Sequence, residues 1–326
     1  MTDTHERVTP SQRSVVSGRI DEPGGESPSF AVPDAAPVGL PPSPEPFDIG
    51  HRRFDWGRRT YIMGIVNVTP DSFSGDGLLA GFARDPDRVA EAAAGLVRAM
   101  VADGADLVDV GGESSRPGHQ PVDTAEEIRR VVPAVAAIRA AFPDLPISVD
   151  TVKPSVAAAA IDAGADLVND VWGIADDDRL ARLAAEREVP LVLMHNRAEA
   201  RYTNLIAEVI AELQRAIERA LAVGVPWDGI VIDPGFGFGK APEHNVALLR
   251  NLAALRVLAR PILLGTSRKS TLGRVLDLPP DERLEATLAT TALGIAAGVD
   301  IVRVHDVRAN VRAARMTDAV VRGTYR

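Results

Sequence analysis

Eight short apolar runs recur along the chain from about residue 60 onward, and longer segments of helical period separate them. Each run is almost continuously apolar, as expected for a parallel strand buried on both faces. Strands that alternate with helical segments need crossover connections and therefore predict a parallel sheet. The predicted strands are Tyr61–Val68, Asp106–Val110, Pro146–Val149, Ala165–Val168, Pro190–Met194, Gly229–Ile232, Pro261–Leu264 and Asp300–Val304.

An internal repeat indicates that one βα unit recurs. The pattern Ala-Asp-Gly-Ala-Asp at 102–106 has close copies at 162–166 and 296–300 and a looser copy at 222–226, each shortly before or at the start of a predicted strand. The central glycine can end a helix in the left-handed conformation. Eight such units over about 260 residues predict an α/β fold, the (β/α)8 TIM barrel. The alternative is a doubly wound open sheet, although no GxGxxG motif follows the first strand.

Composition separates the N-terminal part from the rest. Residues 1–46 are rich in Pro, Ser, Gly and Asp and are expected to form a disordered tail, with the barrel over 47–326. The absence of cysteine excludes disulfides, thiol nucleophiles and cysteine-ligated metals. The net charge of -9 and the lack of a membrane-spanning run or signal pattern favour a cytoplasmic protein that binds neither nucleic acid nor membrane.

Every predicted strand ends in residues that hydrogen-bond or ionise. In a barrel of this kind the carboxyl ends of the strands form the active-site face. One Asp or Asn at such a place is often only a helix cap, but eight strand ends that converge on one mouth predict a site. The strand-end residues include Asn67, Asp109, Asp150, Asn169, Met194, Asp233, Thr266, Arg303 and His305.

The types of residue predict a pocket with two different ends. The loop Gly265–Ser270 carries hydroxyls and two cations before a short helix, and with Arg303 and His305 it predicts a phosphate or pyrophosphate site. Lysine is scarce, and the only three, Lys153, Lys240 and Lys269, all follow strand ends. Acceptors for the N–H and NH2 groups of an aminopyrimidinone ring come from Asp150, Asn169 and Asp233. A flat heteroaromatic diphosphate fits both ends.

The strand-end motifs resemble those of dihydropteroate synthases, in family order. They are YIMGIVNVTPDSF at 61–73, GGESSRPG at 111–118, SVDT at 148–151, LVND at 167–170, DPGFGFGK at 233–240, GTSRKS at 265–270 and RVHDV at 303–307. The resemblance spans roughly residues 59–324. It implies a Mg²⁺-dependent transferase of folate biosynthesis. Such an enzyme joins 6-hydroxymethyl-7,8-dihydropterin diphosphate to para-aminobenzoate, with 7,8-dihydropteroate and pyrophosphate as products.

The resemblance also implies roles for individual residues. Asn67 would ligate Mg²⁺ and, with His305, bind the diphosphate. Arg303 would stack on the pterin. The other pterin contacts would be Asp150, Asn169, Asp233 and Lys269, with apolar walls from Met194 and Phe238. The residues around para-aminobenzoate would be Phe73, Ser115, Arg116, Pro117 and Ser270. The residues expected to act in catalysis are Asn67, Lys269, Arg303 and His305.

The implied reaction needs no enzymic nucleophile. Departure of pyrophosphate leaves a cationic pterin methylene, and the amine of para-aminobenzoate attacks it. Closure of the loops 69–82 and 113–122 would exclude water from this cation. The family also implies a homodimer, for which the Ala/Val-rich helices expected at about 281–297 and 306–321 offer a surface.

Several positions depart from the family pattern or carry a structural interpretation. Gly75 stands where the family more often has Asp, which here follows as Asp76, and Ser115 replaces a commoner Thr. His195 is interpreted as a hydrogen-bonded structural histidine. Lys240 is either a contact at the phosphate end or, in the preferred interpretation, part of a loop salt bridge. Arg197 has no assigned role. Asp170 and Asp306 are interpreted as helix caps or as supports of neighbouring site residues, and Phe236 as a wall of the pocket.

Two other functions remain open at this point. A pterin-dependent corrinoid methyltransferase domain would share the barrel and the Asp/Asn pterin site, but it would lack the SRKS and RVHDV motifs. A non-catalytic pterin-binding paralogue would keep the barrel, and the displaced Asp76 favours it. A zinc hydrolase is disfavoured because no HxH follows the first strand.

Overall fold

The computed structural model describes Met1 and residues 43–69, 86–114, 121–173 and 177–324. The chain divides into two units, Met1–Ala35 and Ala36–Arg326, and the barrel lies in the second. The tail predicted over 1–46 falls almost entirely outside the described residues, as do Phe73, Gly75, Asp76, Ser115, Arg116 and Pro117.

Eight parallel strands form the barrel, as predicted. Neighbours in the sheet follow the order β8-β7-β6-β5-β4-β3-β10-β9. One further parallel bridge between Ile232 and Ile262 connects the two ends, so the sheet closes and the open-sheet alternative is wrong. The strands are β3 (Tyr61–Asn67), β4 (Leu107–Gly111), β5 (Ile147–Asp150), β6 (Leu167–Asp170), β7 (Leu191–Met194), β8 (Ile230–Asp233), β9 (Leu263–Leu264) and β10 (Ile301–Val304).

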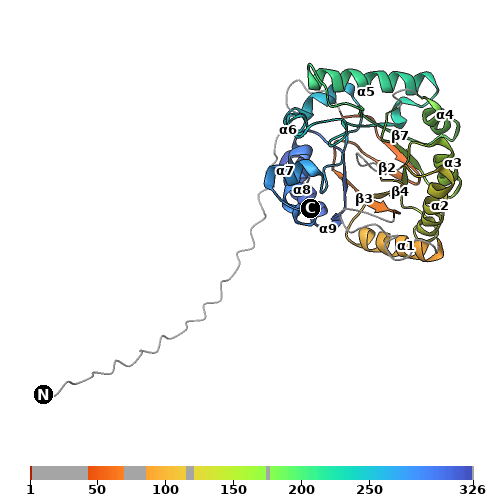
Figure 1. Ribbon diagram of the computed structural model, residues 1–326, viewed down its shortest axis with the longest axis horizontal. Helices are drawn as coiled ribbons and strands as arrows, with labels where there is room; N and C mark the ends of the chain where they lie inside the picture. The colour runs from red at the N-terminus through yellow and green to blue at the C-terminus, as the bar shows by residue number, and fades with distance from the viewer. Residues whose placement is uncertain (2–42, 70–85, 115–120, 174–176, 325–326) are drawn as a thin grey trace, which may run out of the picture. The chain divides into compact units, whose positions relative to one another are not determined.

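Helices surround the strands, so that α5, α1 and the group α6 to α9 lie on different sides of the barrel (Figure 1). The helices are α1 (Pro86–Ala102), α2 (Thr124–Ala141), α3 (Pro154–Asp162), α4 (Arg179–Glu186), α5 (Leu205–Ala222), α6 (Pro242–Arg250), α7 (Ser270–Leu276), α8 (Leu284–Ala296) and α9 (Val307–Arg322). Short 3-10 helices occupy Trp227–Gly229, Leu252–Leu258 and Pro280–Glu282. None of the described helices combines the length and the apolar character that crossing a bilayer requires.

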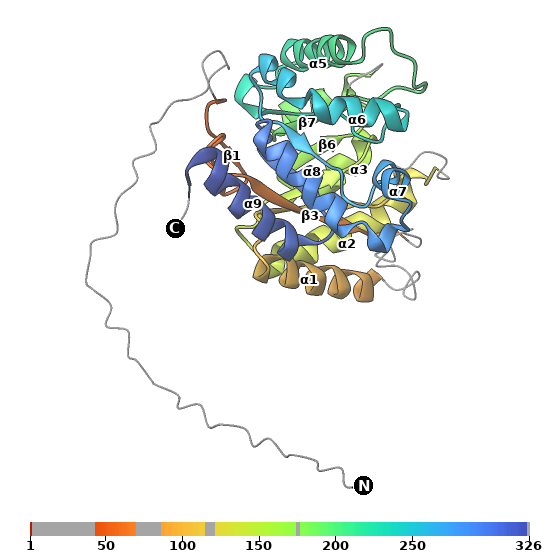
Figure 2. The same ribbon diagram turned by 90° about the vertical axis from the view of Figure 1, so that its left-hand side faces the viewer.

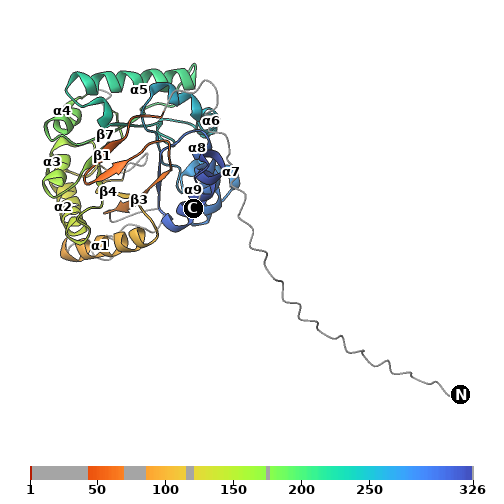
Figure 3. The same ribbon diagram turned by 180° about the vertical axis from the view of Figure 1, so that it is seen from behind.

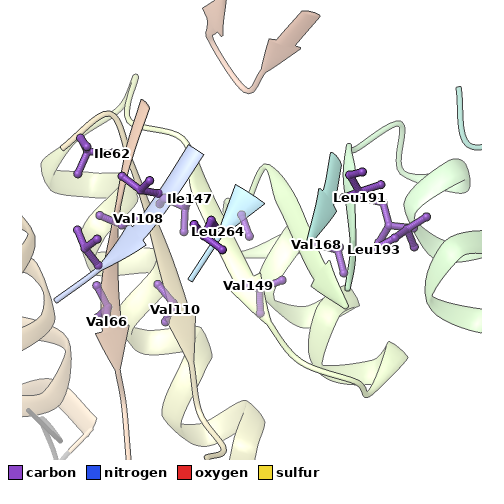
Figure 4. Packing of buried hydrophobic residues seen from close by; sticks show 14 of the residues in the cluster. Ile62, Val66, Val108, Val110, Ile147, Val149, Val168, Leu191, Leu193 and Leu264 are labelled. Carbon is purple, nitrogen blue, oxygen red and sulfur yellow. The ribbon is translucent and has the colours of Figure 1, made fainter. Parts of the chain in front are cut away.

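Side chains alternate between the inside and the outside of the barrel. Outward residues such as Val66, Val108 and Val149 pack against the helices (Figure 4). Inward residues such as Met63 and Leu107 belong to a second buried cluster inside the strands. This alternation follows from the period of two of a strand, and it decides which strand-end side chains reach the mouth.

A β-hairpin that the sequence analysis did not predict closes the opposite end of the barrel. It comprises β1 (Phe47–Ile49) and β2 (Arg52–Phe54), paired antiparallel. Figure 2 places β1 and α7 at opposite ends of the barrel, and Figure 3 shows the hairpin across the strands from behind. Phe54 stacks on Trp56 and tilts against Tyr61, with ring centroids 5.3 and 4.6 Å apart. The hairpin thus covers this end of the barrel interior with apolar side chains.

Replacing Phe54 with alanine is expected to lower the free energy of unfolding by about 3–5 kcal/mol, because it empties a fully buried aromatic site. Phe54 is 1% exposed. Chemical denaturation followed by circular dichroism measures the change. Val257, which is 66% exposed, gives a matched control, since Val257→Ala should change stability by less than about 0.5 kcal/mol. Equal effects of the two substitutions would contradict the claim that packing of the hairpin stabilises the barrel.

Candidate active site

A cavity of about 580 Å³ opens at the carboxyl ends of the strands. It lies between the loops that follow β3, β4, β8, β9 and β10 and the short helix α7. Residues of the predicted site that line it are Asn67, Asp150, Phe238, Lys269, Ser270, Arg303 and His305. The structure therefore brings together groups that lie more than 200 residues apart in the chain.

Strand alternation explains why these side chains point into the barrel. Arg303 is two residues beyond Ile301, which belongs to the inner cluster, while Val302 and Val304 between and after them belong to the outer one. Asp150 likewise follows the outward Val149. Three more predicted residues lie at inward strand positions but do not line this cavity: Asn169, Met194 and Asp233. Met194 instead borders a second cavity of about 200 Å³.

A network of ionic and polar groups forms the floor of the main cavity. Arg303 donates from Nε to Asp109 Oδ2 at 2.6 Å and from a terminal nitrogen to Asp150 Oδ2 at 2.9 Å. Asn169 Nδ2 donates to the same Asp109 oxygen at 3.2 Å. Asp109 was named above only as a strand end, and its place on the inner side of β4, two residues after Leu107, is the signal that could have found it. Arg303 is thus ion-paired where the resemblance implied ring stacking.

Burial raises the pKa of Asp150 to about 7, against the opposing effect of Arg303. Asp109 and Glu127 add to the rise because their negative charges disfavour a further anion. Protonation of Asp150 is therefore expected within the range of ordinary assays.

Binding of 6-hydroxymethylpterin is expected to strengthen as the pH rises through about 7, because only the ionised Asp150 accepts from ring N–H groups with both oxygens. The alcohol carries no diphosphate, so the titration of phosphate oxygens does not contribute. Stability follows the opposite sign: a raised pKa means that the contribution of this carboxyl is complete at low pH and is lost as the pH rises through 7. Calorimetric titration from pH 6 to 8 checks the binding. Asp150→Asn should bind more weakly and independently of pH, and a pH-independent wild type would contradict the assignment.

Lys269 connects the floor to the wall made by residues 233–240. Its Nζ donates to the carbonyl oxygen of Phe236 and lies 4.4 Å from the ring centroid of Phe238. Burial lowers the pKa of Lys269 to about 8, while the negative charge of Asp233 opposes the shift. Asp233 in turn accepts from the N–H of Gly235 at 2.7 Å. An ammonium, a carboxylate and an aromatic face therefore meet at one place.

The opposite corner of the cavity is rich in cations and hydroxyls. His305 Nδ1 lies 2.9 Å from Ser267 Oγ, and its backbone N–H donates to the same oxygen at 3.2 Å. Arg268 pairs with Asp306 at 2.7 Å. Cationic residues that line the cavity are Lys240, Arg268, Lys269, Arg274, Arg283 and Arg303, against the acidic Glu113 and Asp150. This balance favours an anionic ligand.

The structure agrees with some of the predictions for the remaining polar residues and not with others. The salt bridge predicted for Lys240 is not found within the described part of the chain; its Nζ is buried and lies 2.8 Å from His195 Nδ1. His195 is buried and hydrogen-bonded, as predicted. Arg197 pairs with Glu208 at 2.7 Å.

Asp170, Asp306 and Phe236 support their neighbours. Asp170 accepts from the N–H of Trp172 at 2.9 Å, as a turn residue does. Asp306 precedes α9 and pairs with Arg268 without capping the helix through its side chain. Phe236 is fully buried beneath Lys269.

Lys153, the third lysine, also lies at the mouth. It pairs with Glu113 and Glu127 and donates to the carbonyl oxygen of Val122 at 2.7 Å.

Comparisons with known proteins identify the family of this chain. The family model for pterin binding enzymes matches residues 63–305. The dihydropteroate synthase of Clostridium beijerinckii is 49% identical over 84% of this chain and 99% of its own length. The Clostridium difficile dihydropteroate synthase solved with pteroic acid has a TM-score of 0.77 and 48% identity, covering 82% of this chain and 99% of that one. The Yersinia pestis enzyme solved with a sulfonamide drug has a TM-score of 0.78 and 36% identity, covering 86% of this chain and all of that one. The chain therefore belongs to the dihydropteroate synthase family of pterin-binding transferases.

Proposed function

We propose that the two ends of this cavity hold the two halves of a pterin diphosphate while para-aminobenzoate attacks the carbon between them. The reaction is the dihydropteroate synthase reaction of the family, with 7,8-dihydropteroate and pyrophosphate as products. The observation that carries the proposal is that the buried acids at the floor are ion-paired with Arg303, whereas the further cations Arg268, Arg274 and Arg283 line the cavity around α7. The Clostridium difficile relative was solved in the presence of pteroic acid, which is consistent with a site that takes both halves of the product.

The floor is assigned to the pterin ring. Asp150, Asn169 and Asp233 supply acceptors for its N–H and NH2 edge, and Lys269 supplies a donor. Met194 and Phe238 are the proposed apolar walls. Since Arg303 now occupies an oxygen of Asp150 at 2.9 Å, the ring must displace that bond when it arrives. The freed guanidinium can then lie against the ring face.

The cationic corner is assigned to the diphosphate. Asn67 and His305 both line the cavity, and Ser267 orients the imidazole through Nδ1. Asn67 offers a hard oxygen of the kind that Mg²⁺ prefers, and a magnesium site of this kind takes its other ligands from substrate phosphates and water. Bound Mg²⁺ would neutralise charge on the leaving pyrophosphate. The described residues contain no cluster of three acidic or histidine ligands.

The residues of the chain then act by binding, orientation and exclusion of water. His305 stabilises the negative charge that develops on pyrophosphate as the C–O bond breaks, while Lys269 holds the pterin ring. The amine of para-aminobenzoate forms the new C–N bond and loses its proton. Ser270, which lines the cavity, is proposed beneath para-aminobenzoate. The other proposed contacts of this substrate lie outside the described residues: Phe73, Ser115, Arg116 and Pro117. Sulfonamides, as seen bound to the Yersinia pestis relative, are expected to compete here.

Incubation of the purified protein with the pterin diphosphate, para-aminobenzoate and Mg²⁺ tests the reaction directly. Mass spectrometry should detect dihydropteroate, and omission of Mg²⁺ should abolish it. Binding of the pterin diphosphate without any product would instead favour a non-catalytic paralogue. Transfer of a methyl group from a methylated pterin to a corrinoid partner, without any dihydropteroate, would favour the methyltransferase alternative.

A homodimer through α8 and α9 is also part of the proposal. Leu293, Met316 and Val320 on these two helices are 62%, 66% and 74% exposed, and apolar side chains gathered on neighbouring helices are candidates for a subunit contact. Val320→Asp is therefore expected to convert the dimer to a monomer in analytical ultracentrifugation, whereas Val257→Asp at another exposed site should leave the dimer intact. A wild-type monomer would contradict this interface. Cytoplasmic location belongs to the same proposal, because a diphosphate substrate does not cross membranes unaided.

A further inference from the structure

The ammonium of Lys240 is held by dipoles rather than by a carboxylate. Its side chain is buried, with 9% of the residue exposed. Nζ donates to the carbonyl oxygens of Gly235 at 3.0 Å and Phe238 at 3.1 Å, and the third partner is His195 Nδ1 at 2.8 Å. A longer contact joins Nζ to the carbonyl oxygen of His195 at 3.5 Å, so the amine is surrounded by acceptors. Removing it would take a donor from the Phe238 carbonyl oxygen and from His195 Nδ1, which is costly, whereas the Gly235 oxygen would keep the N–H of Phe238.

The loop 233–240 curls around this ammonium. Gly235, Gly237 and Gly239 all have positive φ, of 67°, 86° and 53°. At Gly235 and Gly239 a Cβ would collide with backbone atoms of His195 and Arg197, respectively. The curl therefore depends on glycine and on close contact with the segment after β7. It turns the carbonyl groups of Gly235 and Phe238 toward Nζ.

His195 presents a nitrogen lone pair to Lys240. Burial, then the positive charge of Lys240, lowers the pKa of His195 to about 3, so the ring is neutral at neutral pH. With Nδ1 as acceptor the proton is on Nε2, which lies 3.0 Å from Glu212 Oε2. Glu212 is itself paired with Arg197. The contact with Lys240 therefore orients the imidazole through Nδ1.

The same loop forms the seat of Lys269. Between the two carbonyl groups that Lys240 holds, Phe236 turns its carbonyl oxygen to Lys269 Nζ. The Phe238 ring lies 4.4 Å from that ammonium. A Cβ at Gly237 would approach Lys269 Cδ to 2.9 Å, so the backbone and the lysine stem are packed directly together. The position of Lys269 thus depends on the conformation that Lys240 stabilises.

We propose that Lys240, oriented by His195, is a positioning residue that holds the loop 233–240 in the conformation that seats Lys269 for pterin binding. The proposal rests on the proposed role of Lys269 and adds a partner that acts only through it. Lys240 and Lys269 are therefore one functional unit on two strand-end loops. A residue that acts only through another loses its effect when the other is removed.

A double-mutant cycle tests this dependence. The dissociation constant of 6-hydroxymethylpterin is measured by calorimetry for wild type, Lys240→Met, Lys269→Ala and the double variant, each checked for folding by circular dichroism. Lys240→Met alone is expected to weaken binding about tenfold, because Lys269 would then no longer be placed to donate its charged hydrogen bond to the pterin. In the Lys269→Ala background it should weaken binding less than about twofold. If the fold-changes of the two single variants multiply in the double variant, the proposal is overturned. An unchanged affinity of Lys269→Ala would also overturn it and would at the same time remove the proposed role of Lys269.

Two further comparisons separate positioning from general stability. Lys153→Met is the control, because it removes a lysine from another strand-end loop, where the side chain pairs with Glu113 and Glu127. Its effect on the dissociation constant should be independent of Lys269, so that the fold-changes of Lys153→Met and Lys269→Ala multiply in the double variant. If Lys240→Met does not fold, His195 supplies the test. His195→Asn keeps an acceptor near the position of Nδ1 and should retain pterin affinity within about threefold, whereas His195→Leu should lose about tenfold. Equal affinities of the Asn and Leu variants would overturn the proposal.

Discussion

Replacing Lys269 with alanine is expected to lower kcat/KM for both substrates by about 100- to 1000-fold, the usual effect of removing one donor from a preorganised site. The ammonium meets the Phe236 carbonyl group and the Phe238 ring inside the cavity. Its loss leaves the buried Asp233 without its principal favourable charge. Steady-state kinetics with each substrate varied in turn measures the effect.

Lys269→Arg is a control for charge alone. The planar guanidinium of Arg is larger than an ammonium and cannot place a single donor at the Phe236 oxygen in the same way. We therefore expect it to rescue less than about a tenth of the lost activity. Near-normal turnover of Lys269→Ala would remove this residue from the site.

Replacing Arg303 with alanine is expected to lower kcat/KM for the pterin diphosphate by about 100-fold and to change the KM for para-aminobenzoate by less than about threefold. Arg303 bonds Asp109 at 2.6 Å and Asp150 at 2.9 Å, and all three side chains are mostly buried. The alanine variant leaves two acids close together without their cation. The free energy of unfolding should therefore fall by about 3–5 kcal/mol at neutral pH.

Denaturation curves and substrate-resolved kinetics measure both parts of this prediction. Arg59, which pairs with Asp106 at 2.7 Å with about half of its side chain exposed, is a matched control. Arg59→Ala removes a surface ion pair and should cost less than about 1 kcal/mol. Equal losses for the two substrates in Arg303→Ala would contradict a pocket whose floor binds only the pterin.

Much of the barrel could be predicted because the parallel strands have a strong local signal. Continuous apolar runs such as Tyr61–Val68 follow from burial on both faces, and β3 occupies Tyr61–Asn67. The hairpin at Phe47–Phe54 could not be predicted in the same way. Its strands have three residues each, too few for a period to appear. Its apolar side chains are explained only by the open end of the barrel that they fill.

The inward side chains of the strands can be predicted from strand alternation as well as from motifs. Motifs identify Asn67 and Arg303, whereas Asp109 is recognised as inward only because it lies two residues after the inward Leu107 on the same strand. Partners that depend on loop conformation could not be predicted from strand alternation. Lys240 was expected to bind a carboxylate, because the sequence does not reveal that three glycines turn backbone carbonyl groups toward it. Solvation of a buried ammonium by dipoles is a property of the folded loop.

A crystal structure of this chain with 6-hydroxymethyl-7,8-dihydropterin diphosphate would test the two-ended site most directly. The ring should lie on the floor with its N–H edge on Asp150, and the guanidinium of Arg303 should have left the position in which it now bonds Asp150 at 2.9 Å. The diphosphate should lie between Asn67 and His305. A ring bound elsewhere while Arg303 still pairs with Asp109 and Asp150, or a diphosphate away from His305, would contradict the account.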